Sequence, residues 1–266
     1  MQTIYQCFPG GKHKVLTLSY DDGKLTDRRL IALFNRYGLK ATFHLNSGLM
    51  DQPERIPQNE INALYQGHEV AAHTLTHPTI ARCPLSEVAK EILEDRKNLE
   101  ALVGYPVRGL SYPNGSYNQA IKELLPHLGI EYSRIVGSSK RFNMAEDLLA
   151  WEATCHHRDG LMDLAREFVA LYKTQYLYMM YVWGHSIDFD NDHNWEVIEE
   201  FCEFISKRED IWFATNIEIV DYLKAFKNLQ FAASGQFVYN PSVVPVWISV
   251  NGRVIELKGG TQTELE

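Results

Sequence analysis

Apolar runs and polar breaks alternate along most of the chain in a strand-then-helix order. Residues 15–19 form a short apolar run typical of a strand, and Asp21-Asp22-Gly23 closes it. Apolar positions then recur at helical spacing through residues 27–37, and Gly38 ends that segment. The first unit is therefore predicted to be a strand, a loop and a helix.

The same unit occurs about seven times in all. Further strands are predicted at residues 41–45, 69–72, 109–111, 132–136, 176–183 and 211–214. Further helices are predicted at residues 59–66, 86–103, 118–128, 161–172, 194–207 and 217–226. Strands that alternate with helices in this way indicate parallel strands joined by right-handed crossovers. We therefore predict an α/β fold, a closed or nearly closed (β/α)7-type barrel, which the family resemblance described below implies to be distorted.

The C-terminal tail has a different pattern. From residue 237 it reads as short β segments, and residues 246–250 and 253–257 flank Asn251-Gly252, a dipeptide typical of a two-residue hairpin turn. We expect residues 1–230 to form the barrel domain and residues 231–266 to form a small β-rich extension outside the catalytic part.

Polar clusters follow several of the predicted strands. In α/β barrels the active site is built from the loops after the strands, so these clusters are expected to meet on one rim. They are Asp21-Asp22 after the first strand, His73 and His77 after the third, Tyr112-Pro113 after the fourth, and His185 after the strand that ends at residue 183.

The residue types on this rim are typical of a metal site. Asp21 and Asp22 can address one site only if the strand ends between them, and a cation would then separate the roles of the two carboxylates. His73 and His77 are four residues apart, which a tight turn brings to one face. Alternatives are an ordinary surface turn and two unrelated loop histidines. Two histidines and a carboxylate also serve non-haem iron oxygenases, so the ligands alone name neither metal nor reaction.

Four motifs resemble the polysaccharide deacetylase family, carbohydrate esterase family 4, over most of residues 14–226. The family's T-F-D-D-G resembles residues 19–23, and its H-[ST]-x-x-H is matched in full by residues 73–77. Its R-P-P-Y-G is similar to residues 111–115, and its leucine-x-histidine is similar to residues 183–185. The resemblance implies the NodB-type domain, a distorted (β/α) barrel.

The resemblance departs from the family at three places. The family arginine that orients the catalytic aspartate aligns with Ser111, so either Arg108 or another residue is expected to take that role. Trp183 stands where the family has a leucine that lines the acetyl pocket. The aspartate of the fourth motif has no clean counterpart. Residues 151–158 could offer a partner for His185 or a substrate contact, or they could form a loop with surface histidines.

The resemblance implies a metal-dependent hydrolase that removes N-acetyl groups from amino sugars of a polysaccharide or oligosaccharide, a reaction on a non-peptide C–N bond. One divalent metal ion is expected, zinc first, with Co²⁺, Ni²⁺ or Fe²⁺ as alternatives. The implied roles are metal binding by Asp22, His73 and His77, proton acceptance by Asp21, protonation of the amine by His185, an oxyanion contact from the backbone N–H of Tyr112, and substrate contacts by Trp183, Tyr112 and Pro113.

Other functions stay open at this point. The departures leave room for a hydrolase of a cyclic amide or ureide, similar to allantoinase. A non-catalytic carbohydrate-binding derivative is disfavoured because Asp21, Asp22, His73, His77 and His185 are all present. An iron oxygenase is disfavoured because the ligands occur in the order Asp, then His-x-x-x-His, on an α/β pattern.

Composition narrows the partners. A formal charge of −8 and the lack of any Lys/Arg run argue against nucleic acid and favour a neutral or weakly charged substrate. The partner that the resemblance implies is an N-acetylated carbohydrate. No apolar stretch approaches the roughly 18 residues of a membrane span. The first ten residues lack the pattern of a secretion signal, and the four cysteines lie far apart, so we expect reduced thiols and a cytoplasmic location.

Overall fold

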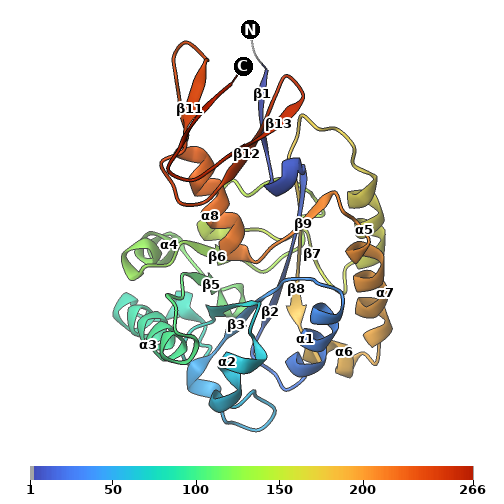
Figure 1. Ribbon diagram of the computed structural model, residues 1–266. Coiled ribbons are helices and arrows are strands. Elements are labelled where there is room, and N and C mark those ends of the chain that lie inside the picture. The colour runs from blue at the N-terminus through green and yellow to red at the C-terminus, as the bar shows by residue number, and fades with distance from the viewer. Residues whose placement is uncertain (1–2, 266) are drawn as a thin grey trace.

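The computed structural model describes residues 3–265 and contains one parallel sheet that forms the body of the molecule (Figure 1). Its strand order is β6-β5-β4-β3-β2-β8-β7, and every pairing is parallel. The strands are β2 (Lys14–Asp21), β3 (Thr42–Leu45), β4 (Glu69–Ala72), β5 (Gly109–Ser111), β6 (Tyr132–Arg134), β7 (Cys155–His156) and β8 (Tyr178–His185). The prediction of a distorted seven-stranded α/β barrel is therefore confirmed.

The segment from Trp151 to His156 links the two edges of this sheet. At the β6 edge, the backbone N–H of Trp151 donates to the carbonyl of Ser133 at 2.8 Å. The carbonyl of Trp151 accepts from the backbone N–H of Ile135 at 3.1 Å. Cys155 and His156 then pair with β8. The two-residue β7 was not predicted, because so short a strand leaves no periodic pattern. The predicted last strand is β9 (Ile211–Phe213), which pairs with the start of β2.

Helices cover the outside of the sheet. They are α1 (Asp27–Arg36), α2 (Ile61–Leu64), α3 (Leu85–Val103), α4 (Gln119–Leu124), α5 (Leu161–Ala170), α6 (Ile187–Asn191), α7 (Trp195–Ser206) and α8 (Asn216–Lys227). Along β2, Leu16, Leu18 and Tyr20 belong to the main hydrophobic core. Because side chains alternate along a strand, the residues between them face the opposite way, into the barrel.

The N-terminus of α8 closes one end of the barrel with hydrogen bonds. The backbone N–H of Asn216 donates to Thr42 Oγ1, and that of Ile217 donates to Glu69 Oε2, both at 2.9 Å. Thr215 caps the helix in a capping box with Glu218. The barrel interior is therefore polar at this end and joined to a helix.

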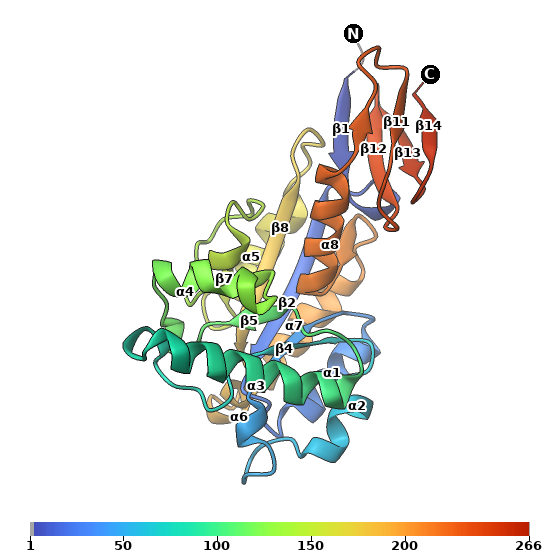
Figure 2. The same cartoon turned by 90° about the vertical axis from the view of Figure 1, so that its left-hand side faces the viewer.

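The tail forms two small antiparallel sheets beside α8 (Figure 2). One is β10 (Gln230–Phe231), β11 (Phe237–Tyr239) and β14 (Gln262–Glu264). The other contains the predicted hairpin, β12 (Val246–Val250) and β13 (Arg253–Leu257), and its third strand is β1 (Ile4–Cys7) from the other end of the chain. The sequence did not predict this pairing, which brings both ends of the chain together at the tail (Figures 1 and 2). Among residues 3–265, no helix is long and apolar enough to span a membrane.

Candidate metal centre

Asp22, His73 and His77 lie together where β2 and β4 end. Their ligand atoms all lie within 4.8 Å of one another, and Asp22 Oδ1 is 3.9 Å from His77 Nε2. Asp22 Oδ1 is buried and makes no hydrogen bond within residues 3–265, although Arg55 Nη1 is 3.5 Å away. A buried carboxylate oxygen without a hydrogen-bond partner destabilises the fold unless a cation or another group binds it. The three side chains therefore fit a divalent cation.

Backbone geometry turns both neighbouring aspartates toward this site. Asp21 is the last residue of β2, and Asp22 follows with a φ of 84°, in the left-handed region that asparagine and aspartate tolerate better than most residues. The expected strand end between the two carboxylates is therefore present. Arg55 donates a hydrogen bond to the carbonyl of Asp22, which holds this unusual conformation.

The loop that carries the two histidines is fastened to α3. The buried carboxylate of Asp95 accepts hydrogen bonds from the backbone N–H of His73 at 3.0 Å and of Ser47 at 2.7 Å. Glu91, one turn earlier, accepts from the backbone N–H and the hydroxyl of Thr76. On the ring of His73, Nδ1 contacts the carbonyl and hydroxyl of Ser111, which leaves Nε2 for a metal.

Asp21 is paired with an arginine, but not with Arg108. Arg108 contacts Asp221 and Glu131 and precedes β5, at the opposite end of that strand from the site, so its expected role is wrong. Arg134 at the end of β6 donates to Asp21 Oδ2 instead, and Ser111 Oγ donates to Oδ1 at 3.2 Å. Burial alone would raise the pKa of Asp21, but the charge of Arg134 outweighs it and holds the pKa well below its usual range.

Tyr112 does not offer the expected oxyanion contact. Its backbone N–H already donates to the carbonyl of Arg134 at 3.0 Å, because Tyr112 continues the pairing of β5 with β6. Pro113 has no N–H, so Asn114 carries the next backbone donor of this loop. The expectation for Tyr112 is therefore corrected.

His185 ends β8 and lies opposite Asp21 in the register of β2 and β8. Its Nδ1 is 3.3 Å from Oδ2 of Asp188, on the first turn of α6. Burial lowers the pKa of His185, but the hydrogen bond to Asp188 and the charges of Asp21 and Asp22 outweigh it and raise the pKa above the ordinary value. Asp188 is thus the acidic partner that the sequence did not reveal, although it follows His185 by only three residues.

The aromatic residues of the rim are mostly packed against the protein. Trp183 is 7% exposed, Arg134 lies over its ring at 4.3 Å, and its Nε1 donates to the carbonyl of Gly137. Tyr112 and Pro113 are also buried, so none of these three has a face open for stacking on a sugar. Tyr117, which stacks on Tyr112 at 4.7 Å, is 37% exposed. A role for Trp183 in shaping an acetyl pocket stays a prediction.

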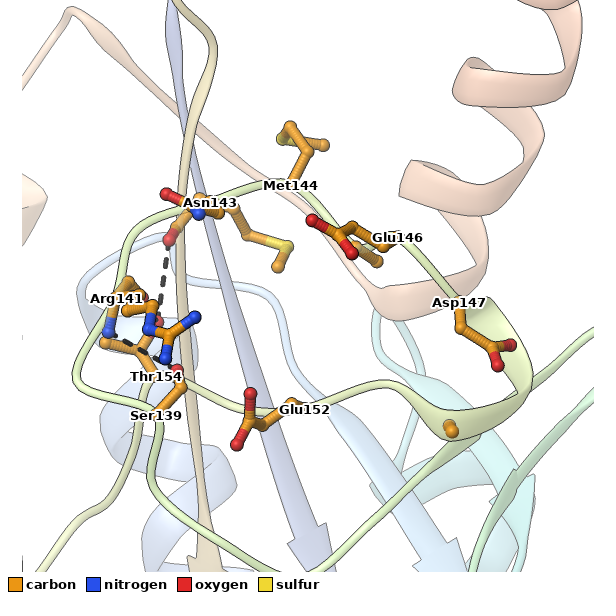
Figure 3. Close-up of a pocket in the computed structure, with 11 residues that line it drawn as sticks. Ser139, Arg141, Asn143, Met144, Glu146, Asp147, Glu152 and Thr154 are labelled. Atoms are coloured by element: carbon orange, nitrogen blue, oxygen red, sulfur yellow. Dashed lines mark hydrogen bonds between the residues drawn. The ribbon is translucent and has the colours of Figure 1, made fainter.

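A separate cavity of about 260 Å³ lies in the loop between β6 and β7 (Figure 3). Arg141, Glu146 and Glu152 are among its polar lining residues, and Thr154 Oγ1 donates to the carbonyl of Arg141 within it. None of the predicted site residues lines this cavity. It is therefore distinct from the metal centre.

Part of the chain is similar in sequence to known proteins. Residues 9–133 match the sequence profile of the family described as polysaccharide deacetylase. A peptidoglycan-N-acetylmuramic acid deacetylase of Bacillus subtilis is 28% identical over 111 residues, which are 41% of this chain and 23% of that protein. The match therefore spans about a quarter of the length of this relative.

Solved structures share the fold. A Mycobacterium smegmatis structure described as a polysaccharide deacetylase superposes with a TM-score of 0.62 at 17% identity, covering 84% of this chain and 94% of that one. A family 4 acetyl xylan esterase from Clostridium thermocellum, in complex with a cobalt ion, gives a TM-score of 0.56 at 14% identity over 79% of this chain and 91% of that one. The chain is therefore similar to polysaccharide deacetylases in the sequence of residues 9–133, and it shares the fold of these two structures.

Proposed function

We propose that this protein is a metal-dependent hydrolase that removes N-acetyl groups from amino sugars. The observation that carries the proposal is the convergence of Asp22, His73 and His77 within 4.8 Å, with Asp21 and His185 in register on the adjoining strands. The match to a deacetylase of N-acetylated peptidoglycan supports the amide as the bond that is cleaved. The natural substrate is proposed only as a class, an N-acetylated carbohydrate.

Asp22, His73 and His77 would hold the cation, and zinc suits two imidazoles and one carboxylate. The bound cation would supply Lewis acidity, lowering the pKa of the attacking water and polarising the acetamide carbonyl. Co²⁺, Ni²⁺ and Fe²⁺ accept the same ligands. The cobalt ion in the acetyl xylan esterase structure supports a divalent transition metal in this fold.

Asp21 and His185 divide the proton transfers. Asp21 accepts the proton of the attacking water, while Arg134 and Ser111 fix the orientation of its carboxylate. His185 gives a proton to the amine nitrogen as the C–N bond breaks, because an amine leaves poorly without one. The contact of His185 Nδ1 with Asp188 leaves Nε2 as the proton donor. The N–H of Asn114 takes the oxyanion role once expected of Tyr112.

Acetate release from a panel of N-acetylated oligosaccharides tests this proposal. Zinc-reconstituted protein should release acetate, and Asp21→Asn and His185→Ala should lower kcat by roughly 10²–10⁴ without losing the metal. Exposed His127 provides a matched control, since His127→Ala should keep wild-type kcat. Metal-loaded wild-type protein that releases no acetate, but opens a cyclic amide or ureide, would overturn the deacetylase proposal.

A further inference from the structure

A second group of metal-type ligands lies beside His185, apart from Asp22, His73 and His77. It consists of His156 at the end of β7, His157 next to it, and Asp188 on α6. Oδ2 of Asp188 is 3.4 Å from His156 Nε2 and 3.6 Å from His157 Nε2. Nitrogen and oxygen ligands of a tetrahedral zinc ion, each about 2.0–2.1 Å from the metal, lie about 3.3 Å from one another. The two separations from Asp188 are close to this value, and all three ligand atoms lie within 4.8 Å of one another.

His157 gives a second, independent indication of a ligand. Its side chain is 2% exposed, and neither ring nitrogen has a hydrogen-bond partner within residues 3–265. The 3.6 Å between Nε2 and Asp188 Oδ2 is too long for a hydrogen bond. The ring stacks on Phe189 at 4.2 Å and on Tyr20 at 5.9 Å, so it is held facing Asp188. A cation bound between His157 Nε2 and Asp188 Oδ2 would give this buried imidazole a partner and remove the free-energy cost of leaving it without one.

The surroundings orient these ligands. Arg158 Nη2 lies 3.2 Å from Oδ1 of Asp188, while Oδ2 is the oxygen that faces the histidines. Contacts of this kind to the outer side of a ligand are usual around bound metals. The two imidazoles and one carboxylate favour zinc-like ions over Mg²⁺ or Ca²⁺, which prefer oxygen ligands.

We propose that His156, His157 and Asp188 form a second site for a divalent transition-metal cation, separate from the deacetylase centre. The site shares Asp188 with His185, whose Nδ1 is 3.3 Å from the same oxygen. A cation there would hold the carboxylate that positions His185. This inference does not depend on the proposed deacetylase activity, since it rests on geometry outside Asp22, His73 and His77.

Metal stoichiometry of the full chain tests the second site. The protein is stripped with a chelator, incubated with Zn²⁺, passed over a desalting column and measured for bound zinc by mass spectrometry. Wild-type protein should retain two equivalents, His77→Ala one, His156→Ala one, and the double variant none. His127→Ala, on the exposed surface, should retain two. Circular dichroism checks each fold, and His156→Gln replaces His156→Ala if the alanine variant unfolds.

Cobalt provides a readout at each site. Co²⁺ bound to His77→Ala should give visible absorption from the second site, and His156→Gln added to that variant should abolish it. A folded His156 variant that still retains two equivalents, or a folded His77→Ala that retains none, would overturn the proposal. In that case the cluster is a network of imidazoles around one carboxylate without metal. Two bound equivalents without acetate release would leave the second site standing and the deacetylase proposal refuted.

Discussion

Arg134 donates a hydrogen bond to Asp21 from the strand next to the one where the family motif places its arginine. Arg134 is the register partner of Ser111, which occupies the aligned position of the family arginine. The small side chain of Ser111 leaves room for the guanidinium, and its hydroxyl contacts the same carboxylate at 3.2 Å. The arginine that orients Asp21 is therefore on β6 in this protein, one strand away from the position on β5 that aligns with the family arginine.

Arg134→Met should abolish activity and strongly destabilise the fold. Both partners are buried, so removal of the cation leaves a carboxylate without compensation, a loss of about 3–5 kcal/mol. Urea unfolding measures that loss, and acetate release measures the activity. Because Met also removes the cation that lies over the Trp183 ring, Arg134→Lys separates charge from shape. The lysine variant should recover part of the stability and little of the activity.

Arg108→Ala is the matched control for Arg134. Arg108 is 30% exposed and pairs with Asp221 and Glu131, so its loss should cost about 1 kcal/mol or less and leave kcat unchanged. A loss of activity in this variant equal to that of Arg134→Met would show that the assignment of the orienting arginine to Arg134 is wrong.

The sequence predicted what depends on local pattern. The alternating apolar runs predicted the barrel. One motif matched in full and one matched in part predicted the cluster of Asp22, His73 and His77. Arg134 and Asp188 were missed because they act across strands or from a short helix, where no spacing marks them. The pairing of β1 with β12 was missed for the same reason, since it joins residues about 245 apart (Ile4 with Val250). Long-range register is set by packing that one sequence does not display.

Removal of bound metal should lower the thermal stability of the protein. A cation that binds only the folded chain stabilises it by about 2.7 kcal/mol at one hundred times its Kd, which corresponds to a Tm rise of several degrees at this chain length. Differential scanning calorimetry of chelator-treated protein, with and without added Zn²⁺, measures the shift. His77→Ala should show a smaller rise, and an equal rise would exclude His77 as a ligand.

Glu69 should make the stability of the fold depend on pH. Its carboxyl group is buried in the barrel, and burial raises its pKa from 4.5 to about 7 despite hydrogen bonds from Ile217, Tyr132 and Thr42. The folded state therefore favours the protonated form. The contribution of Glu69 to the free energy of unfolding is fully present below pH 4.5 and is lost as pH rises through 7. At about 1.4 kcal/mol per pKa unit, the loss is roughly 3 kcal/mol.

Urea unfolding between pH 5 and 8 measures the Glu69 effect as a slope. Glu69→Gln cannot titrate, so the fall in unfolding free energy with rising pH should be smaller in this variant, whatever its stability at one pH. Glu167→Gln, on α5, provides a control for the loss of one exposed acid. Equal slopes in wild type and Glu69→Gln would mean that Glu69 is not the group that titrates.

Gly184 should be intolerant of even one added carbon. A Cβ at this position would lie 2.1 Å from His157 Nδ1 and 2.4 Å from its Cε1, so the imidazole would have to move. His157 is packed against Phe189 and Tyr20 and has no room to shift without displacing them. Gly184→Ala should therefore cost about 1–3 kcal/mol through overpacking. It should also remove the second equivalent of zinc while the Asp22–His73–His77 equivalent is retained.

Gly38→Ala is the control variant, because no atom lies within 4 Å of its added carbon. The stability cost of Gly38→Ala comes only from the positive φ of 66°, and its zinc content should stay at two. Full zinc content in Gly184→Ala would show that the position of His157 does not matter for metal binding.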